Sequence, residues 1–262
     1  MADFIPKSEC GREFQACWTL AASYIQRLGY GELEWFKGNL YSPIYEHFSF
    51  RLRNQLFFVR LEDAEGRLRM PGTLGGLLEI SRRCHGHPLI MPMKNIGGIW
   101  LPIVPGWGLL DAFSKVSVSP ESFPPGESIP LSQWELQDRA VASILSGLDP
   151  ASIVSFTNHP YLSPSIWYEG ESGLEWVIVR RARTMGDPVS LPSNFSEILT
   201  LAELRGAGNG YLASVYIGAR ERAAGITRDN GSLYRGDILD IKILKMSPIV
   251  ERRSSTLQAL ES

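Results

Sequence analysis

Three cysteines in 262 residues are too few, and odd in number, for a disulfide framework, which is typical of a reducing compartment. Basic and acidic side chains nearly balance, 26 against 28, so no overall field would draw the protein to nucleic acid or to an anionic membrane. No apolar run approaches the roughly 20 residues that span a bilayer. The first residues lack the cationic start and apolar stretch of a secretory signal. We therefore expect a soluble cytoplasmic protein with no membrane partner.

Signatures of several enzyme classes are also missing. There is no Gly-x-Ser-x-Gly nucleophile elbow, no P-loop and no His-Glu-x-x-His motif. Cys84, His85 and His87 come nearest to a zinc site, but Cys10 and Cys17 stand on a predicted helix without the Cys-x₂₋₄-Cys spacing of structural sites. The pattern favours buried free cysteines and a histidine-bearing helix end, so no metal site is predicted there.

What the chain does contain is a proline-rich segment near its middle, at residues 119–130. Each proline removes a backbone donor and biases the preceding residue away from helix. We interpret this segment as a linker between a module at 1–118 and a second module at 131–262, each near the usual domain size. The alternative is a long surface loop inside one domain.

The first half combines one amphipathic helix with strand signals. Apolar residues from Phe14 to Leu28 recur at three- and four-residue spacing, which predicts a helix. Residues 49–53 and 56–62 read as strands, followed by a turn and a partner strand at 67–70. Asn95-Ile96-Gly97-Gly98 predicts a second hairpin. We therefore expect a helix and antiparallel-strand module.

The second half opens with Ser132-Gln133-Trp134-Glu135, a capping-box pattern that predicts the start of a helix ending near Ser146. Apolar runs then predict three strands, a helix and two further strands. The predicted fold class of the chain is α+β, and its C-terminal α/β module is expected to have a mixed sheet flanked by helices. The later elements are expected at 154–157, 166–169, 174–181, 195–205, 211–219 and 237–244.

Two short motifs follow the predicted helix of this half: Ser163-Pro164-Ser165 before the second strand and Glu175-Trp176-Val177 in the third. The order of helix, three strands, helix and strand resembles the layout of the PD-(D/E)xK nucleases. The resemblance implies a helical Glu, a Pro-Asp site and a (D/E)xK triplet around Mg²⁺, which lowers the pKa of an attacking water. By position, Glu135 would be the helical acid, Ser163-Pro164-Ser165 would take the Pro-Asp site, and Glu175-Trp176-Val177 would take the triplet.

Two of the four expected groups are absent. Serine is a poor ligand for a hard cation, and Val177 can supply neither a charge nor a proton. Each acid also has a structural interpretation, Glu135 as a capping-box residue and Glu175 as the partner of an arginine. One hypothesis is therefore an atypical Mg²⁺-dependent nuclease that acts on nucleic acid. Its acids would be Glu135 and Glu175, together with Glu169 or Glu171.

Aromatic side chains crowd the segment before the first strands. Trp35, Phe36, Tyr41 and Tyr45 can stack bases, anchor a protein partner or simply fill the core. The second hypothesis is a non-enzymatic interaction module, without a cofactor, that binds a protein partner through these four residues. The missing Asp and Lys favour this second hypothesis.

Overall fold

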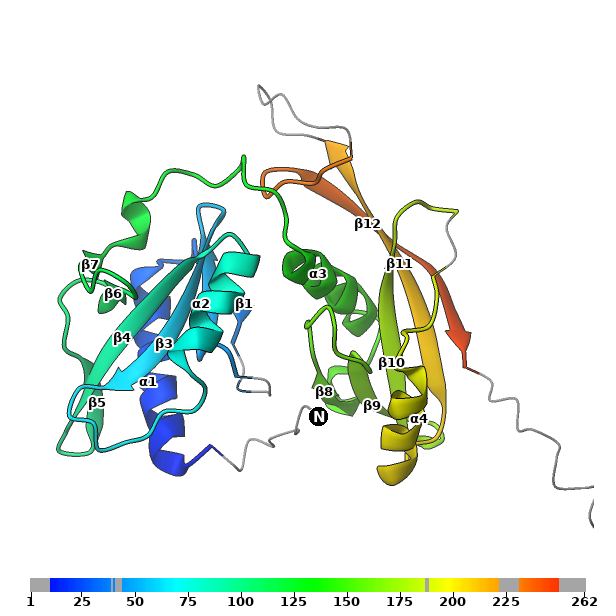
Figure 1. Ribbon diagram of the computed structural model, residues 1–262, viewed down its shortest axis with the longest axis horizontal. Coiled ribbons are helices and arrows are strands. Elements are labelled where there is room, and N and C mark those ends of the chain that lie inside the picture. Colours follow the sequence, from blue (N-terminus) through cyan, green and yellow to red (C-terminus); the bar gives the residue numbers. More distant parts are fainter. Residues whose placement is uncertain (1–9, 39, 41–43, 187–188, 222–230, 250–262) are drawn as a thin grey trace, which may run out of the picture. The chain divides into compact units, whose positions relative to one another are not determined.

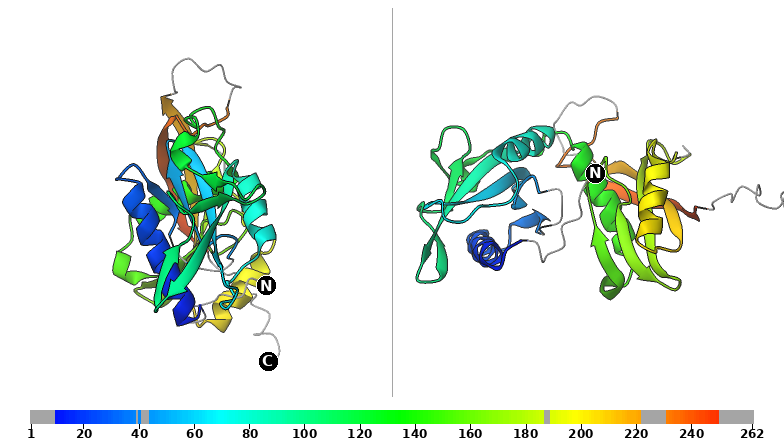
Figure 2. Two further views of the ribbon diagram at one scale, coloured as in Figure 1. Left: turned by 90° about the vertical axis from the view of Figure 1, so that its left-hand side faces the viewer. Right: turned by 60° about the horizontal axis from the view of Figure 1, so that its bottom comes forward.

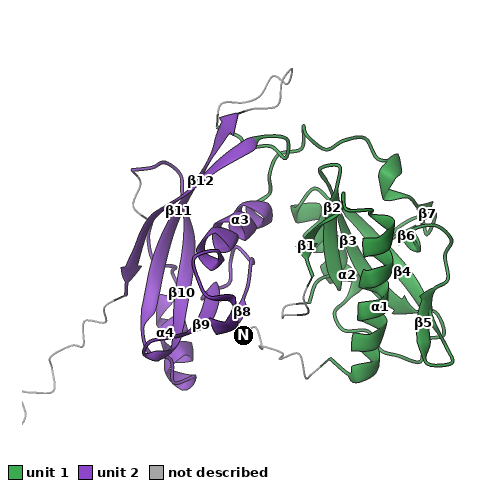
Figure 3. Cartoon of the chain, turned by 180° about the vertical axis from the view of Figure 1, so that it is seen from behind, with its two compact units in different colours: residues 1–132, 222–237 green, residues 133–221, 238–262 purple. Residues whose placement is uncertain are grey.

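The computed structural model describes residues 10–38, 40, 44–186, 189–221 and 231–249 (Figure 1). Helices and two mixed sheets confirm the predicted α+β class. The chain forms two compact units, one of residues 1–132 and 222–237 and the other of residues 133–221 and 238–262 (Figure 3). Among the helices in these described ranges, none is long and apolar enough to cross a membrane.

The first unit is a sheet with a helix on each face (Figure 2). Its strands run in the order β1-β2-β3-β4-β6-β7, and β5 pairs with β4 beside this path. The elements in chain order are α1 (Arg12–Leu28), β1 (Glu34–Lys37), β2 (Phe48–Leu52), β3 (Gln55–Asp63), α2 (Leu74–Arg83), β4 (His87–Ile96), β5 (Ile99–Pro102), β6 (Leu109–Asp111) and β7 (Ser117–Val118).

Helix α1 supplies one side of the core. Its apolar face, Phe14, Cys17, Ala21 and Ile25, is buried against the sheet together with side chains of β2, β3 and β4. Burial, with smaller effects of nearby carboxylates, raises the pKa of the Cys17 thiol to about 12. The helix predicted from the spacing of its apolar residues is therefore present and carries the expected face inward.

The sheet departs from the prediction in two places. Strands β3 and β4 pair in parallel through the crossover helix α2, so the sheet is mixed and not purely antiparallel. The predicted strand at 67–70 is wrong, because the Asp63 carboxylate accepts hydrogen bonds from the backbone N–H groups of Glu65, Arg67 and Leu68 and closes a loop there. The β4–β5 hairpin is present, with positive φ at Gly97 and Gly98 as its two-residue turn requires.

The second unit is a five-stranded sheet in the order β12-β11-β10-β9-β8. Strands β10 and β11 are parallel and the other neighbours are antiparallel. Helix α3 contacts β10, β11 and β12, while α4 packs through Ile198 and Ala202 on Trp167, Trp176 and Ile178. The elements are α3 (Gln133–Leu145), a 3₁₀ turn η3 (Pro150–Ser152), β8 (Ile153–Phe156), β9 (Ile166–Gly170), β10 (Gly173–Ala182), α4 (Phe195–Leu204), β11 (Gly210–Glu221) and β12 (Ile238–Pro248).

The proline-rich segment is hydrogen-bonded within the first unit. It contains a 3₁₀ turn, η2 (Pro120–Ser122), the Arg53 guanidinium donates to the Glu121 carbonyl, and the Gln55 side-chain amide donates to the Pro124 carbonyl. Residues 231–237 belong to the same unit, where the Leu131 N–H donates to the Leu233 carbonyl. The boundaries proposed from the sequence, 1–118, 119–130 and 131–262, stay a prediction.

Candidate functional site

Glu175 lies buried near the start of β10, where both of its oxygens already accept hydrogen bonds. Oε2 accepts from the Tyr168 hydroxyl at 2.7 Å, and Oε1 accepts from Asn209 Nδ2 at 3.2 Å. Burial, reinforced by the Glu175 carboxylate, raises the pKa of Tyr168 well above its usual value. The phenol therefore stays a donor at neutral pH, and the arrangement fits a carboxylate that joins β9, β10 and the start of β11.

A second polar cluster lies further along β10. Gln137 Nε2 donates to the Val179 carbonyl at 3.2 Å and contacts Ser165 Oγ at 3.5 Å, and the Val179 N–H donates to the same hydroxyl. Four residues separate Val179 from Glu175, about 13 Å along a strand. The structure thus brings Ser165 to Val179 on β10 and brings Glu175 to Tyr168 and Asn209.

Two of the other predicted acids lie in different surroundings. Glu135 is fully buried in the first turn of α3, half a turn before Gln137. Glu169 is exposed and lies across from Leu174, so alternation along the strand places it on the opposite face from Glu175. A shared divalent ion would need oxygens of all its ligands within about 2.6 Å of one point. No group of three His, Cys, Asp or Glu side chains within the described ranges is arranged to hold a metal ion.

The described aromatic residues that were predicted to contact a partner are partly buried in the first unit. Trp35 is 36% exposed, donates its indole N–H to Gln26 Oε1, and packs edge-on against Phe48 and Phe50. Phe36 and Tyr45 are half-buried, and Phe36 packs against Phe58. Tyr41 lies outside the described residues.

Trp35 also borders a groove beside α1. The groove has a volume of about 480 Å³ and is lined by Trp18, Ala22, Ser23, Gln26, Arg27, Trp35 and Gly38. The Trp18 indole N–H donates to the His47 carbonyl, so both indole groups that line the groove have hydrogen-bond partners. The two rings present apolar surface here without an unsatisfied donor.

Four exposed aliphatic side chains lie in one short stretch at the hairpin of β4 and β5. Ile96 is 56% exposed, Ile99 57%, Leu101 47% and Ile103 51%. Ile96 pairs with Ile99 across the hairpin, and alternation along β5 places Ile99 and Leu101 on one face while Trp100 points into the core. Ile103 is exposed directly after the end of β5. We call these four residues the β5 stripe.

Among the described strands, β5 pairs only with β4, so its outer edge offers backbone donors and acceptors beside the β5 stripe. Natural sheet edges are usually protected by charged side chains, bulges or covering segments. Lys94 lies on the same face, where it pairs with Leu101 and forms an ion pair with Glu65 at 3.3 Å. Apolar surface and an open edge therefore coincide.

Comparison with protein-family models, with curated proteins and with solved structures finds no match.

Sequence reasoning missed the β5 stripe for a physical reason. Residues 99–104 read Ile-Trp-Leu-Pro-Ile-Val, an almost continuous apolar run in which no polar residue marks the outer face. Such a run is typical of a strand buried on both faces, whereas the structure buries only the Trp100 face of β5.

Proposed function

We propose that the chain is a non-enzymatic binding module that acts through a protein partner, and that the partner docks on the β5 stripe. The exposure of four aliphatic side chains on one hairpin carries the proposal. Soluble proteins seldom expose contiguous apolar patches without a function, and such patches mark protein interaction sites.

The chemistry of the surface points to an extended apolar segment as the occupant. A strand added to the edge of β5 would gain main-chain hydrogen bonds, and alternate side chains of the added strand would lie against the stripe. Full burial of an Ile or Leu side chain contributes roughly 1.5–3 kcal/mol, so completing the burial of four half-exposed ones supplies several kcal/mol toward binding.

The arrangement of polar groups argues against the nuclease alternative. The two Glu175 oxygens accept hydrogen bonds from Tyr168 and Asn209. The resemblance would require a carboxylate near Glu175, but the segment at that place carries Ser165, whose hydroxyl accepts a hydrogen bond from the Val179 N–H. The PD-(D/E)xK layout, Mg²⁺ as cofactor and nucleic acid as substrate therefore stay predictions with less support than partner binding.

The experiment compares tagged wild-type protein with an Ile99→Lys, Leu101→Lys variant in the source cells, by quantitative mass spectrometry of retained proteins. Leu20→Lys is the matched control, since Leu20 is 40% exposed on α1 in the same unit. We expect one stoichiometric protein to be retained by the wild type and by the control and to be lost from the double variant. Retention by all three proteins would contradict docking on β5.

A further inference from the structure

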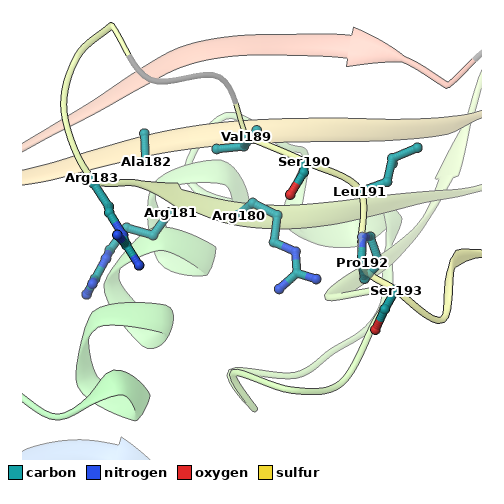
Figure 4. A pocket seen from close by; sticks show the side chains of 9 residues that line it. All are labelled: Arg180, Arg181, Ala182, Arg183, Val189, Ser190, Leu191, Pro192 and Ser193. Carbon is teal, nitrogen blue, oxygen red and sulfur yellow. The ribbon is translucent and has the colours of Figure 1, made fainter.

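Three arginines cluster where β10 ends in the second unit. Arg180, Arg181 and Arg183 line a cavity of about 750 Å³, whose other walls come from Ala182 and the segment 189–193 that leads to α4. Figure 4 shows Arg181 beside Arg183, and Ser190 and Ser193 on the segment that borders the cavity. The same three arginines line a second cavity of about 490 Å³, together with Gln133, Leu136, Gln137, Pro160 and Tyr161.

The cluster carries positive charge without a counter-charge in the described part of the chain. None of the ion pairs found there involves Arg180, Arg181 or Arg183. Arg180 Nε and Arg181 Nη1 are buried and have no hydrogen-bond partner. Buried donors without partners cost stability, and an acceptor that bound beside them would lower this cost.

Electrostatics agree with the geometry. Burial lowers the pKa of Arg180 and of Arg181, and for Arg181 the neighbouring Arg183 guanidinium lowers it further. Guanidinium groups nevertheless stay charged in proteins. The site therefore holds like charges close together, which an anion would relieve.

We propose that Arg180, Arg181 and Arg183 bind the phosphate group of a small phosphorylated ligand. The planar guanidinium fork matches phosphate oxygens, and charge-assisted hydrogen bonds of this kind are short and strong. The hydroxyls of Ser190 and Ser193 line the same cavity and can donate to the remaining oxygens.

Size and charge favour a small molecule over a polymer. A cavity of about 750 Å³ falls in the range of roughly 300–1,000 Å³ that is usual for small-molecule sites. Binding of a nucleic-acid backbone would call for an extended basic surface, whereas the whole chain has a net charge of -2. This inference concerns the second unit and does not depend on docking at β5.

The test measures thermal stability at fixed ionic strength with three probes: pyrophosphate, adenosine monophosphate and adenosine. We expect pyrophosphate and adenosine monophosphate to raise the melting temperature by about 3 °C at tenfold excess over the dissociation constant, and adenosine to have no effect. Calorimetric titration of an Arg181→Gln variant should show at least about tenfold weaker binding of pyrophosphate.

Arg220→Gln is the matched control, because it removes the same charge from an exposed position on β11 in the same unit. It should bind pyrophosphate like the wild type. A second readout separates a binding role from a structural one: without ligand, Arg181→Gln should melt at the same temperature as the wild type or above it, because like-charge repulsion is relieved.

Four results would overturn the proposal. These are no stabilisation of the wild type by either phosphate probe, equal stabilisation by adenosine, equal loss of binding in Arg220→Gln, or binding of single-stranded RNA without any binding of pyrophosphate. Should Arg181→Gln fail to fold, the wild-type probe series alone still decides.

Discussion

At the residue scale, His47 shows how a buried polar side chain constrains the first unit. The ring is fully buried, its Nδ1 accepts a hydrogen bond from the Leu61 N–H, and its Nε2 lies 2.9 Å from the Pro71 carbonyl. One nitrogen must accept and the other donate, so the neutral tautomer fits and the doubly protonated ring does not. Burial is the main cause that lowers the pKa of His47 to about 3.

This environment predicts acid destabilisation. Unfolded His47 takes up a proton near pH 6.5 and the folded ring does so only near pH 3, so the free energy of unfolding falls as pH drops through this interval. We expect a loss of about 2 kcal/mol between pH 7 and pH 5, measured by urea denaturation. His47→Gln should reduce this loss, and burial of His87, which lowers the pKa of that ring as well, accounts for the part that remains. His85→Gln, at an exposed position, is the control. A wild-type stability that does not change over this range would contradict the neutral His47.

Glu175 provides a second prediction at this scale. Glu175→Gln keeps the volume and can still meet Tyr168 and Asn209, so we expect a cost of about 1 kcal/mol in the free energy of unfolding. Mg²⁺ and Mn²⁺ should not shift the melting temperature of the wild type. Glu171→Gln, at an exposed position in the adjoining turn, is the control. A metal-dependent shift that Glu175→Gln abolishes and Glu171→Gln preserves would support the nuclease alternative.

At the scale of elements, the contact of β10 with β11 depends on a tryptophan that lies opposite a glycine. Trp176 is 2% exposed in the cluster beneath α4, and it pairs in register with Gly210. A Cβ atom on Gly210 would overlap with the Trp176 ring. The glycine is therefore required by the close approach of the indole.

The pair predicts a coupled response. Trp176→Ala should cost roughly 3–5 kcal/mol through lost burial and a cavity, and Gly210→Ala should cost about 1–3 kcal/mol through overpacking. In the Trp176→Ala background Gly210→Ala should cost much less, because the clash has gone. Chemical denaturation of the four proteins of this cycle measures the coupling, and additive costs would show that the two residues do not compete for space.

Elements with a clear period of apolar residues could be predicted from the sequence, whereas features that depend on which strands pair could not. The apolar spacing of α1 and the glycine pair of the β4–β5 hairpin each determine local structure directly. The parallel pairing of β3 with β4 depends on how α2 returns the chain, and the loop after Asp63 depends on three side-chain-to-backbone hydrogen bonds. Neither leaves a period in the sequence.

At the scale of the whole molecule, the chain leaves the first unit at Gln133 and returns to it after β11. Arg235 anchors the returning segment, since its guanidinium donates to the carbonyls of Asn54, Cys84 and His85 while being 6% exposed. These contacts join the returning segment to the turn between β2 and β3 and to the end of α2 within the first unit. Partners 150 to 181 residues apart in the sequence cannot be found from composition.

Arg235→Ala should therefore weaken the first unit selectively. Three carbonyls lose a charged donor, and we expect a cost of about 3 kcal/mol in that unit. Hydrogen exchange should rise in peptides from β2, β3 and α2 and stay unchanged in peptides from β9 and β10. The exposed Arg220→Ala is the control. An equal rise in hydrogen exchange in both units, or no rise beyond that of the control, would contradict the anchoring role of Arg235.

Docking of a protein partner on β5 is tested most directly by site-specific photo-crosslinking in the source cells. A photoreactive residue at Ile99 lies on the exposed face of β5, and one at Arg69 samples an exposed position in the same unit. If a partner docks on β5, position 99 should give one discrete adduct with another protein, position 69 should give none, and addition of Leu101→Lys should abolish the adduct. The same adducts from both positions, or no adduct from position 99, would contradict it.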